Sequence, residues 1–127
     1  MKLALDTNRY TDFVRGEVSV VQAIQAAAMV FIPFVVLAEL RAGFRVGSRA
    51  KENEAVLTRI LRRPTVSVLY PDSDTTHHYA AIYAQLRRQG TPVPTNDLWI
   101  AALVVQHELV LYSRDSHFGH IPQVARI

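Results

Sequence analysis

Short apolar stretches typical of buried β-strands alternate along this chain with stretches of helical periodicity, and this alternation limits it to few architectures. Strands are predicted at 3–5, 30–36, 66–69, 109–112 and 124–127. Helices are predicted from Thr11 or Asp12 to Gly16, at 18–28, from Leu37 to Gly47, and at 49–61, 72–89 and 96–107. Short strands separated by helices favour an α/β sandwich with a mostly parallel sheet.

The composition predicts a single globular domain over residues 1–127, with 50% of the residues hydrophobic and 20% charged. The absence of cysteine excludes disulfide bonds, thiolate zinc sites and a cysteine nucleophile. The longest apolar run, Ala26 to Ala38, is broken by Pro33 and is shorter than the ~20 residues that a membrane helix needs. Because the N-terminus reaches Asp6 too soon for a secretory signal, we expect a soluble cytoplasmic protein that makes no membrane contact.

Acidic residues stand where predicted strands end or where the next helices begin. Asp6 and Asp115 each follow a strand closely, and Glu39 comes shortly after another. Asp97 lies in the first turn of a helix for which Asn96 is the predicted N-cap. Alone, each acid could be a turn residue, a cap or a solvated helix position. Because ligands of parallel α/β sheets bind beyond the carboxyl ends of the strands, we expect these acids to converge there.

Carboxylates brought this close repel one another, so the cluster requires protons or cations. A set of oxygen ligands without sulfur suits hard ions such as Mg²⁺ or Mn²⁺. A metal held in this way can polarise a phosphoryl oxygen and activate water, which is the chemistry that phosphodiester hydrolysis needs. The sequence therefore predicts a metal-dependent phosphodiesterase.

The basic residues are mostly arginine and occur in clusters, within a formal net charge of +3. Arginine suits bidentate contact with phosphate, although an ordinary solvated surface would have a similar composition. The arginines nearest the acidic motifs, and therefore the predicted contacts to substrate phosphates, are Arg9, Arg41, Arg45 and Arg114.

Four segments contain the acids and their neighbours: Leu5-Asp-Thr-Asn8, Leu37-Ala-Glu-Leu40, Asn96-Asp-Leu-Trp-Ile-Ala-Ala102 and Ser113-Arg-Asp-Ser-His-Phe118. Together they resemble the motifs of PIN-domain ribonucleases and, more narrowly, of the VapC toxins of bacterial VapBC toxin–antitoxin modules. The resemblance covers essentially the whole chain and implies a three-layer α/β/α sandwich with a short, mostly parallel central sheet.

The resemblance further implies a Mg²⁺- or Mn²⁺-dependent endoribonuclease that cuts structured RNA, either tRNA or rRNA, and halts translation. By this resemblance, the acids expected to be catalytic and to bind metal are Asp6, Glu39, Asp97 and Asp115. The groups expected to orient these acids are Thr7, Asn8, Asn96 and Ser113, the last standing where the family often has threonine. The partners implied are a cognate VapB-type antitoxin and a second copy of the toxin.

Two other functions are open at this point. A non-catalytic RNA-binding or interaction domain would keep the fold and use the acids only to bind metal. A signalling receiver domain also has an aspartate at a strand end, but it needs a late lysine, and this chain has none after Lys51.

The five histidines, His77, His78, His107, His117 and His120, do not predict a zinc site. His117 and His120 fall in a predicted loop, where RNA contact or simple exposure accounts for them. Trp99 and Tyr112 are interpreted as core or interface residues.

Overall fold

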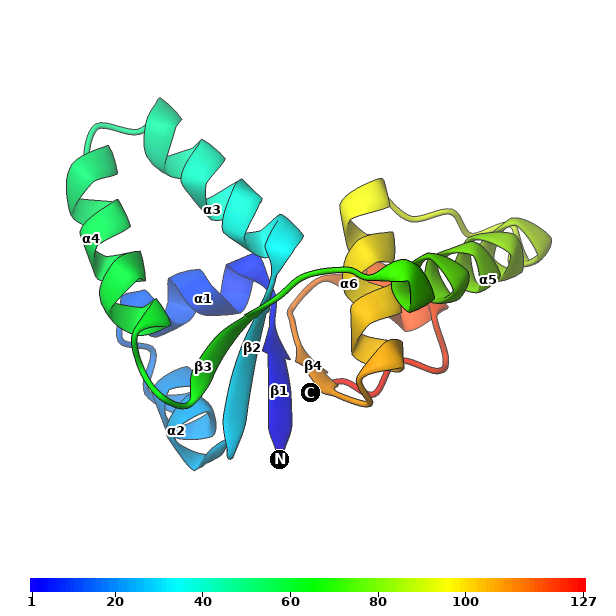
Figure 1. Cartoon of the computed structure of the whole chain (residues 1–127), viewed down its shortest axis with the longest axis horizontal. Coiled ribbons are helices and arrows are strands. Elements are labelled where there is room, and N and C mark those ends of the chain that lie inside the picture. The colour runs from blue at the N-terminus through cyan, green and yellow to red at the C-terminus, as the bar shows by residue number, and fades with distance from the viewer.

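The structure, a computed structural model, describes the whole chain, residues 1–127, and is built around a four-stranded parallel sheet (Figure 1). The strands are β1 (Lys2–Leu5), β2 (Met29–Pro33), β3 (Val66–Leu69) and β4 (Val110–Tyr112), in the order β3-β2-β1-β4. Every neighbouring pair is parallel, with Leu5 beside Tyr112 and Ala4 beside Leu111. The predicted α/β class and largely parallel sheet are thus confirmed.

Six α-helices and one short 3₁₀ helix connect the strands. They are α1 (Thr7–Val14), α2 (Val18–Ala26), α3 (Phe34–Val46), α4 (Ala50–Leu61), α5 (Ser73–Gln89), α6 (Thr95–Gln106) and η1 (Ser116–His120). In Figure 1, α1, α2 and α4 lie on one side of the sheet and α5 and α6 on the other, while α3 continues from the end of β2. The fold therefore has the three expected layers.

The strand order of the sheet has a topological switch point between the neighbouring strands β1 and β4. The first three strands step outward from β1 to β2 to β3, and the connection through α5 and α6 returns to the opposite side of β1. In open α/β sheets, the crevice at such a switch point is the usual ligand site. Here the switch point lies where Asp6 follows β1 and Ser113 follows β4.

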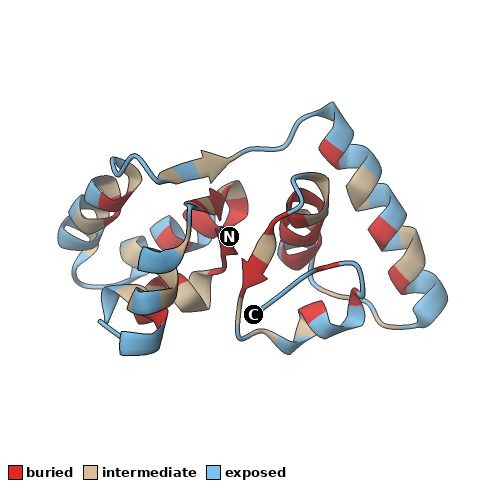
Figure 2. Ribbon diagram, turned by 90° about the horizontal axis from the view of Figure 1, so that it is seen from below, coloured by how far each residue is buried: buried red, intermediate tan, exposed pale blue.

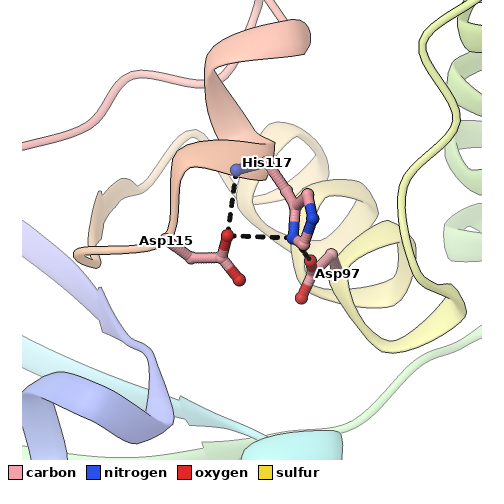
Figure 3. A group of neighbouring side chains, drawn as sticks. All are labelled: Asp97, Asp115 and His117. Carbon is pink, nitrogen blue, oxygen red and sulfur yellow. Dashed lines mark hydrogen bonds and ion pairs between the residues drawn. The ribbon is translucent and has the colours of Figure 1, made fainter.

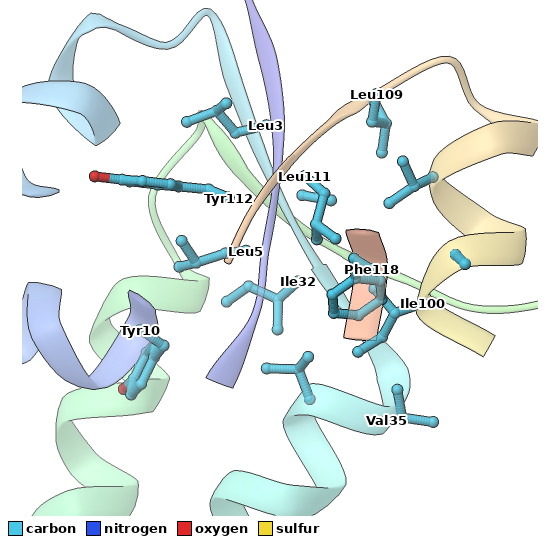
Figure 4. Packing of buried hydrophobic residues seen from close by; sticks show 14 of the residues in the cluster. Leu3, Leu5, Tyr10, Ile32, Val35, Ile100, Leu109, Leu111, Tyr112 and Phe118 are labelled. Atoms are coloured by element: carbon cyan, nitrogen blue, oxygen red, sulfur yellow. The ribbon is translucent and has the colours of Figure 1, made fainter. Parts of the chain in front are cut away.

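Buried apolar side chains pack against both faces of the sheet (Figure 4). Leu5 and Tyr112 lie on one face, and Leu111 lies on the other with Ile100 of α6 and Phe118 of η1. Figure 2 shows α6 mostly buried and α5 buried along a stripe, because α6 lies between the sheet and α5. A central helix of this kind is apolar on nearly all sides.

Several predicted boundaries were wrong. The strand predicted at 30–36 ends at Pro33, and Val35 and Val36 belong to α3, where tertiary packing buries both and outweighs their β propensity. The first helix begins at Thr7 instead of Thr11 or Asp12, because the carboxylate of Asp6 caps it.

The N-cap of α6 is Pro94 in an extended conformation, so the prediction of Asn96 as N-cap was also wrong. Near the C-terminus, part of the loop predicted after residue 117 is the 3₁₀ helix η1. The predicted final strand is reduced to a single parallel bridge between Leu111 and Arg126. No helix combines the length and the apolar character required to cross a bilayer.

Phe118 fastens η1 to the core, since its side chain is 0% exposed. We expect Phe118→Ala to lower the free energy of unfolding by about 3–5 kcal/mol, because it leaves a cavity at a position with no access to water. Urea denaturation would measure this, with the partly buried Phe44→Ala as a control of smaller effect. A loss below about 1 kcal/mol would mean that the packing around η1 collapses to fill the space.

Candidate active site at the carboxyl edge of the sheet

The structure brings the four predicted acids to the carboxyl edge of the sheet from four different elements. Asp6 is the N-cap of α1, Asp97 lies in the first turn of α6, and Asp115 is the N-cap of η1. Partial positive charge at the beginning of a helix favours a carboxylate there, and this offsets part of the mutual repulsion. Glu39 lies further along α3 and lacks this compensation.

Asp6 is 6% exposed and is held by three donors. The backbone amide of Thr7 donates to Oδ1 at 2.8 Å, and the hydroxyl of Ser113 donates to Oδ2 at 2.6 Å. The side-chain amide of Asn8 also donates to Oδ2, at 3.4 Å. Ser113 in turn accepts from the backbone amide of Asp115 at 3.0 Å, so one hydroxyl connects the ends of β1 and β4.

Asp97, Asp115 and His117 form the tightest cluster of potential metal ligands (Figure 3). Nδ1 of His117 lies 3.0 Å from Oδ2 of Asp97 and 2.9 Å from Oδ1 of Asp115. The same Asp115 oxygen accepts from the backbone amide of His117 at 2.9 Å, which is the capping bond of η1. Asp97 is 9% exposed, and its Oδ2 has no hydrogen-bond donor.

Glu39 is linked to this edge through Thr7. The hydroxyl of Thr7 donates to Oε1 of Glu39 at 3.3 Å, and the side chain of Asn96 lies close enough to influence the pKa of the carboxyl group. Shielding of the carboxyl group from water is the largest cause of its raised pKa, and the charges of Asp6 and Asp115 add to it. The polar side chains of Thr7 and Asn96 act in the opposite direction and lower this pKa.

The electrostatic cost of the cluster is clearest at Asp97. Burial, followed by the charges of Asp115 and Asp6, raises the pKa of Asp97 to about 6, although His117 lowers it. Conversely, the charge of Asp115 is the main cause of the raised pKa of His117. Negative charge is therefore concentrated at one edge without enough donors to neutralise it.

A divalent cation would relieve both the crowding of negative charge and the lack of a hydrogen-bond donor at Asp97. It would neutralise the crowded carboxylates, and it would supply the missing partner of the buried Asp97 oxygen. The acidic cluster is thus chemically able to hold a divalent metal ion.

The four arginines predicted to contact RNA fall into two pairs. Arg9 and Arg114 both bind the carboxylate of Asp12, with the guanidinium of Arg114 at 2.9 and 3.0 Å and that of Arg9 at 3.2 Å. Arg41 is ion-paired with Glu54 of α4, and it lines with Arg45 an open groove of about 510 Å³ between α3 and α4. None of the four belongs to the carboxylate cluster itself.

Two residues of this region were missed by the sequence analysis, which left Asp12 without a site role and assigned His117 to exposure or RNA contact. The i to i+3 spacing of Arg9 and Asp12 signals an ion pair within a helix, but nothing in the sequence identifies Arg114 as the second partner. For His117, its position two residues after Asp115 was the available signal. Only the capping geometry of η1 shows that its ring turns toward both acids.

Comparison with known proteins identifies the fold family. A sequence model of the PIN domain matches residues 3–124. The chain belongs to the PIN-domain family.

Among its PIN-domain relatives, ribonuclease VapC1 of Haemophilus influenzae (strain R2866) is 34% identical over 82 residues, which is 65% of this chain. Ribonuclease VapC4 of Mycobacterium tuberculosis is 28% identical over 93 residues, or 73% of this chain and 72% of VapC4. The chain spans only 60% of the length of the VapC1 relative.

Solved structures with the same PIN fold include toxin–antitoxin complexes. The DNA-bound VapBC structure from Salmonella typhimurium superposes with a TM-score of 0.89 at 25% identity, covering 100% of this chain and 97% of the other. VapBC2 of Rickettsia felis, bound to a promoter DNA fragment, gives a TM-score of 0.88 at 21% identity, covering 100% and 98%. The predicted PIN-like sandwich is thereby confirmed.

The raised pKa of Asp97 predicts that ionisation of this residue destabilises the metal-free protein. The unfolded chain releases the proton near pH 4 and the folded chain near pH 6, so stability falls across this window as pH rises. In chelator at about pH 7.5, we expect Asp97→Asn to be more stable than wild type, by at most about 3 kcal/mol. Urea denaturation at that pH and at about pH 3.5, where the difference should vanish, tests this. A wild-type protein more stable than the variant at the higher pH would contradict it.

The ion pairs of Asp12 predict the opposite dependence on pH. Hydrogen bonding to Arg114 is the largest cause of the lowered pKa of Asp12, so its stabilising effect is present above about pH 4 and lost as pH falls through the folded pKa. We expect Asp12→Asn to lower the urea midpoint at neutral pH and to approach wild type in acid. Asp74→Asn, an exposed first-turn acid of α5, is the matched control. An equal loss of stability at both pH values would argue for a packing role of Asp12 instead.

Proposed function

We propose that this protein is a metal-dependent endoribonuclease, the toxin of a type II toxin–antitoxin system, which hydrolyses phosphodiester bonds in structured RNA. The observation that supports this most is the convergence of acids from four elements at the switch point of a PIN fold. The relatives named VapC ribonucleases support the same activity.

In this proposal Asp6, Glu39, Asp97 and Asp115 hold the metal. Thr7, Asn8 and Ser113 orient these acids through the contacts described above, and Asn96 does the same for Glu39. When bound, the ion would polarise the phosphoryl oxygen and lower the pKa of the attacking water. The protein's own contribution is to hold the carboxylates in place, because helix N-termini and fixed donors keep them together before substrate arrives.

Mg²⁺ or Mn²⁺ is the proposed ion. Carboxylate oxygens dominate the site, and both ions prefer oxygen ligands. The raised pKa values of Asp97 and Glu39 imply that metal binding displaces protons, so metal affinity should increase as pH rises through about 6.

The proposed substrate is a folded RNA, either tRNA or rRNA. The chain carries a net charge of +3, and its arginines outnumber its lysines strongly, which suits bidentate phosphate contact. Arg9 and Arg114 are already paired with Asp12, so each would have to share its guanidinium with a phosphate. Arg41, which is itself paired with Glu54, and Arg45 both line the open groove between α3 and α4.

The proposed partners are a VapB-type antitoxin and a second copy of this chain. Similar solved structures include VapBC complexes, two of them bound to DNA, from Salmonella typhimurium and Rickettsia felis. We extend this arrangement to the present chain as an expectation that co-purification with the product of an adjacent reading frame would test. A cytoplasmic location follows from an RNA target of this kind.

A non-catalytic RNA-binding domain is the second candidate. It would use the same fold and the same basic surface, and it would bind RNA without cutting it. Membership of the PIN family argues against the receiver domain, the other alternative suggested by the sequence.

Cleavage of RNA by antitoxin-free protein is the decisive test. We expect discrete fragments of total cellular RNA with Mg²⁺ or Mn²⁺ and none with chelator. Asp6→Ala and Asp97→Ala should each reduce the cleavage rate by more than about 100-fold, because each removes a ligand and not merely a group that orients one. Asp74→Ala, which removes an acid from the first turn of α5 instead of α6, should cleave like wild type.

RNA binding without cleavage under every metal condition would favour the non-catalytic domain. Equal cleavage by wild type and both site variants would show that the activity resides elsewhere or in a contaminant. Mapping the fragment ends would distinguish tRNA from rRNA as the target.

A further inference from the structure

His117 is placed unlike any other histidine of the chain. Its imidazole is 45% exposed, yet the Nδ1 atom is buried and has no hydrogen-bond partner. The buried Oδ2 of Asp97 lies 3.0 Å from this nitrogen and is also without a hydrogen-bond partner. Two orphaned polar atoms therefore face one another at the edge where the carboxylates gather.

The position of the ring is determined by two contacts of η1. Asp115 caps this short helix by accepting from the backbone amide of His117. The next residue, Phe118, is fully buried in the core. These two anchors leave the imidazole directed at Asp97 and Asp115, as Figure 3 shows.

The spacing of these atoms matches that of neighbouring ligands around one ion. Ligands about 2.1 Å from an octahedral cation are about 3.0 Å apart when they are adjacent. Nδ1 of His117 lies 3.0 Å from the Asp97 oxygen and 2.9 Å from the Asp115 oxygen, and all three atoms lie within 4.8 Å of one another. An ordinary hydrogen bond would give similar distances, but Nδ1 has no partner in hydrogen-bond geometry.

We propose that His117 is a nitrogen ligand of the metal site, beside Asp97 and Asp115, and that it shifts the preference of the site from Mg²⁺ toward Mn²⁺. This inference rests on the proposed function, since it concerns the same metal. Imidazole binds transition metals well and contributes little to Mg²⁺, which prefers oxygen ligands and retains its water. A site of carboxylates alone would lack this selectivity.

Electron paramagnetic resonance of bound Mn²⁺ tests the proposal without measuring activity. We expect wild-type protein to show hyperfine coupling from a directly coordinated ¹⁴N nucleus, and His117→Ala to lack it. The variant should also bind Mn²⁺ at least about tenfold more weakly in calorimetry, with a much smaller change for Mg²⁺. His117→Gln, which keeps a polar side chain of similar reach, should likewise lack the ¹⁴N coupling.

His120→Ala is the matched control, because His120 lies on the same short helix with its side chain exposed. It should retain both the coupling and the Mn²⁺ affinity of wild type. Thermal denaturation of each variant would show that the fold is intact before metal binding is compared.

The possible failures are distinguishable. Mn²⁺ bound to wild type without ¹⁴N coupling, or coupling that survives in His117→Ala, would overturn the assignment of His117. In that case metal-dependent RNA cleavage and loss of binding in Asp97→Asn would leave the nuclease proposal standing. Failure of wild type to bind either ion would overturn the metal site and the nuclease proposal together.

Discussion

Mutual repulsion of carboxylates at one edge of the sheet is the constraint on which the site depends. Four acids come from the β1–α1 junction, α3, α6 and the β4–η1 connection. Burial, together with the charges of Asp115 and Asp6, raises the pKa of Asp97 to about 6. The fold tolerates this because three of the acids lie at the beginning of helices. Stability is lost locally so that a cation can be bound, which is a common compromise at functional sites.

The network around Asp6 shows how the fold holds the acids despite that repulsion. Asp6 caps α1 and accepts from Ser113, which is fixed beyond β4. Asp12, one turn and a half further along α1, binds Arg114 in the same β4–η1 connection, and Asn8 accepts from the backbone amide of Arg114 at 3.1 Å. The two sides of the switch point are thus connected by hydrogen bonds and by a partly buried ion pair. These contacts position the acids before any ligand arrives, and such preorganisation is the main contribution that a protein makes to electrostatic catalysis.

His117 extends the same principle to the choice of metal. As a nitrogen ligand of the site, His117 gives the short helix η1 a role in metal binding. The N-cap of η1 and its buried phenylalanine orient the imidazole toward the acids. The PIN fold would then supply the oxygen ligands, while one residue of a terminal segment adjusts selectivity among ions. Small changes in such a segment could alter metal preference without altering the sheet.

The fold class, the order of the elements as far as β4 and the placing of the four acids near element ends could be predicted from the amino-acid sequence, because they depend on local hydrophobic periodicity and on helix and strand boundary residues. The strand ends at Leu5 and Tyr112, the proline stop before α6 and the capped helix at Asp72 are all local signals. Tertiary structure alone decided that Val35 and Val36 are helical, because packing on α3 outweighs their preference for strands. Only the tertiary fold brings Asp12 to Arg114, 102 positions away in sequence, and turns His117 toward Asp97. Contacts between distant segments depend on how the layers pack, and they produce no pattern in the amino-acid sequence.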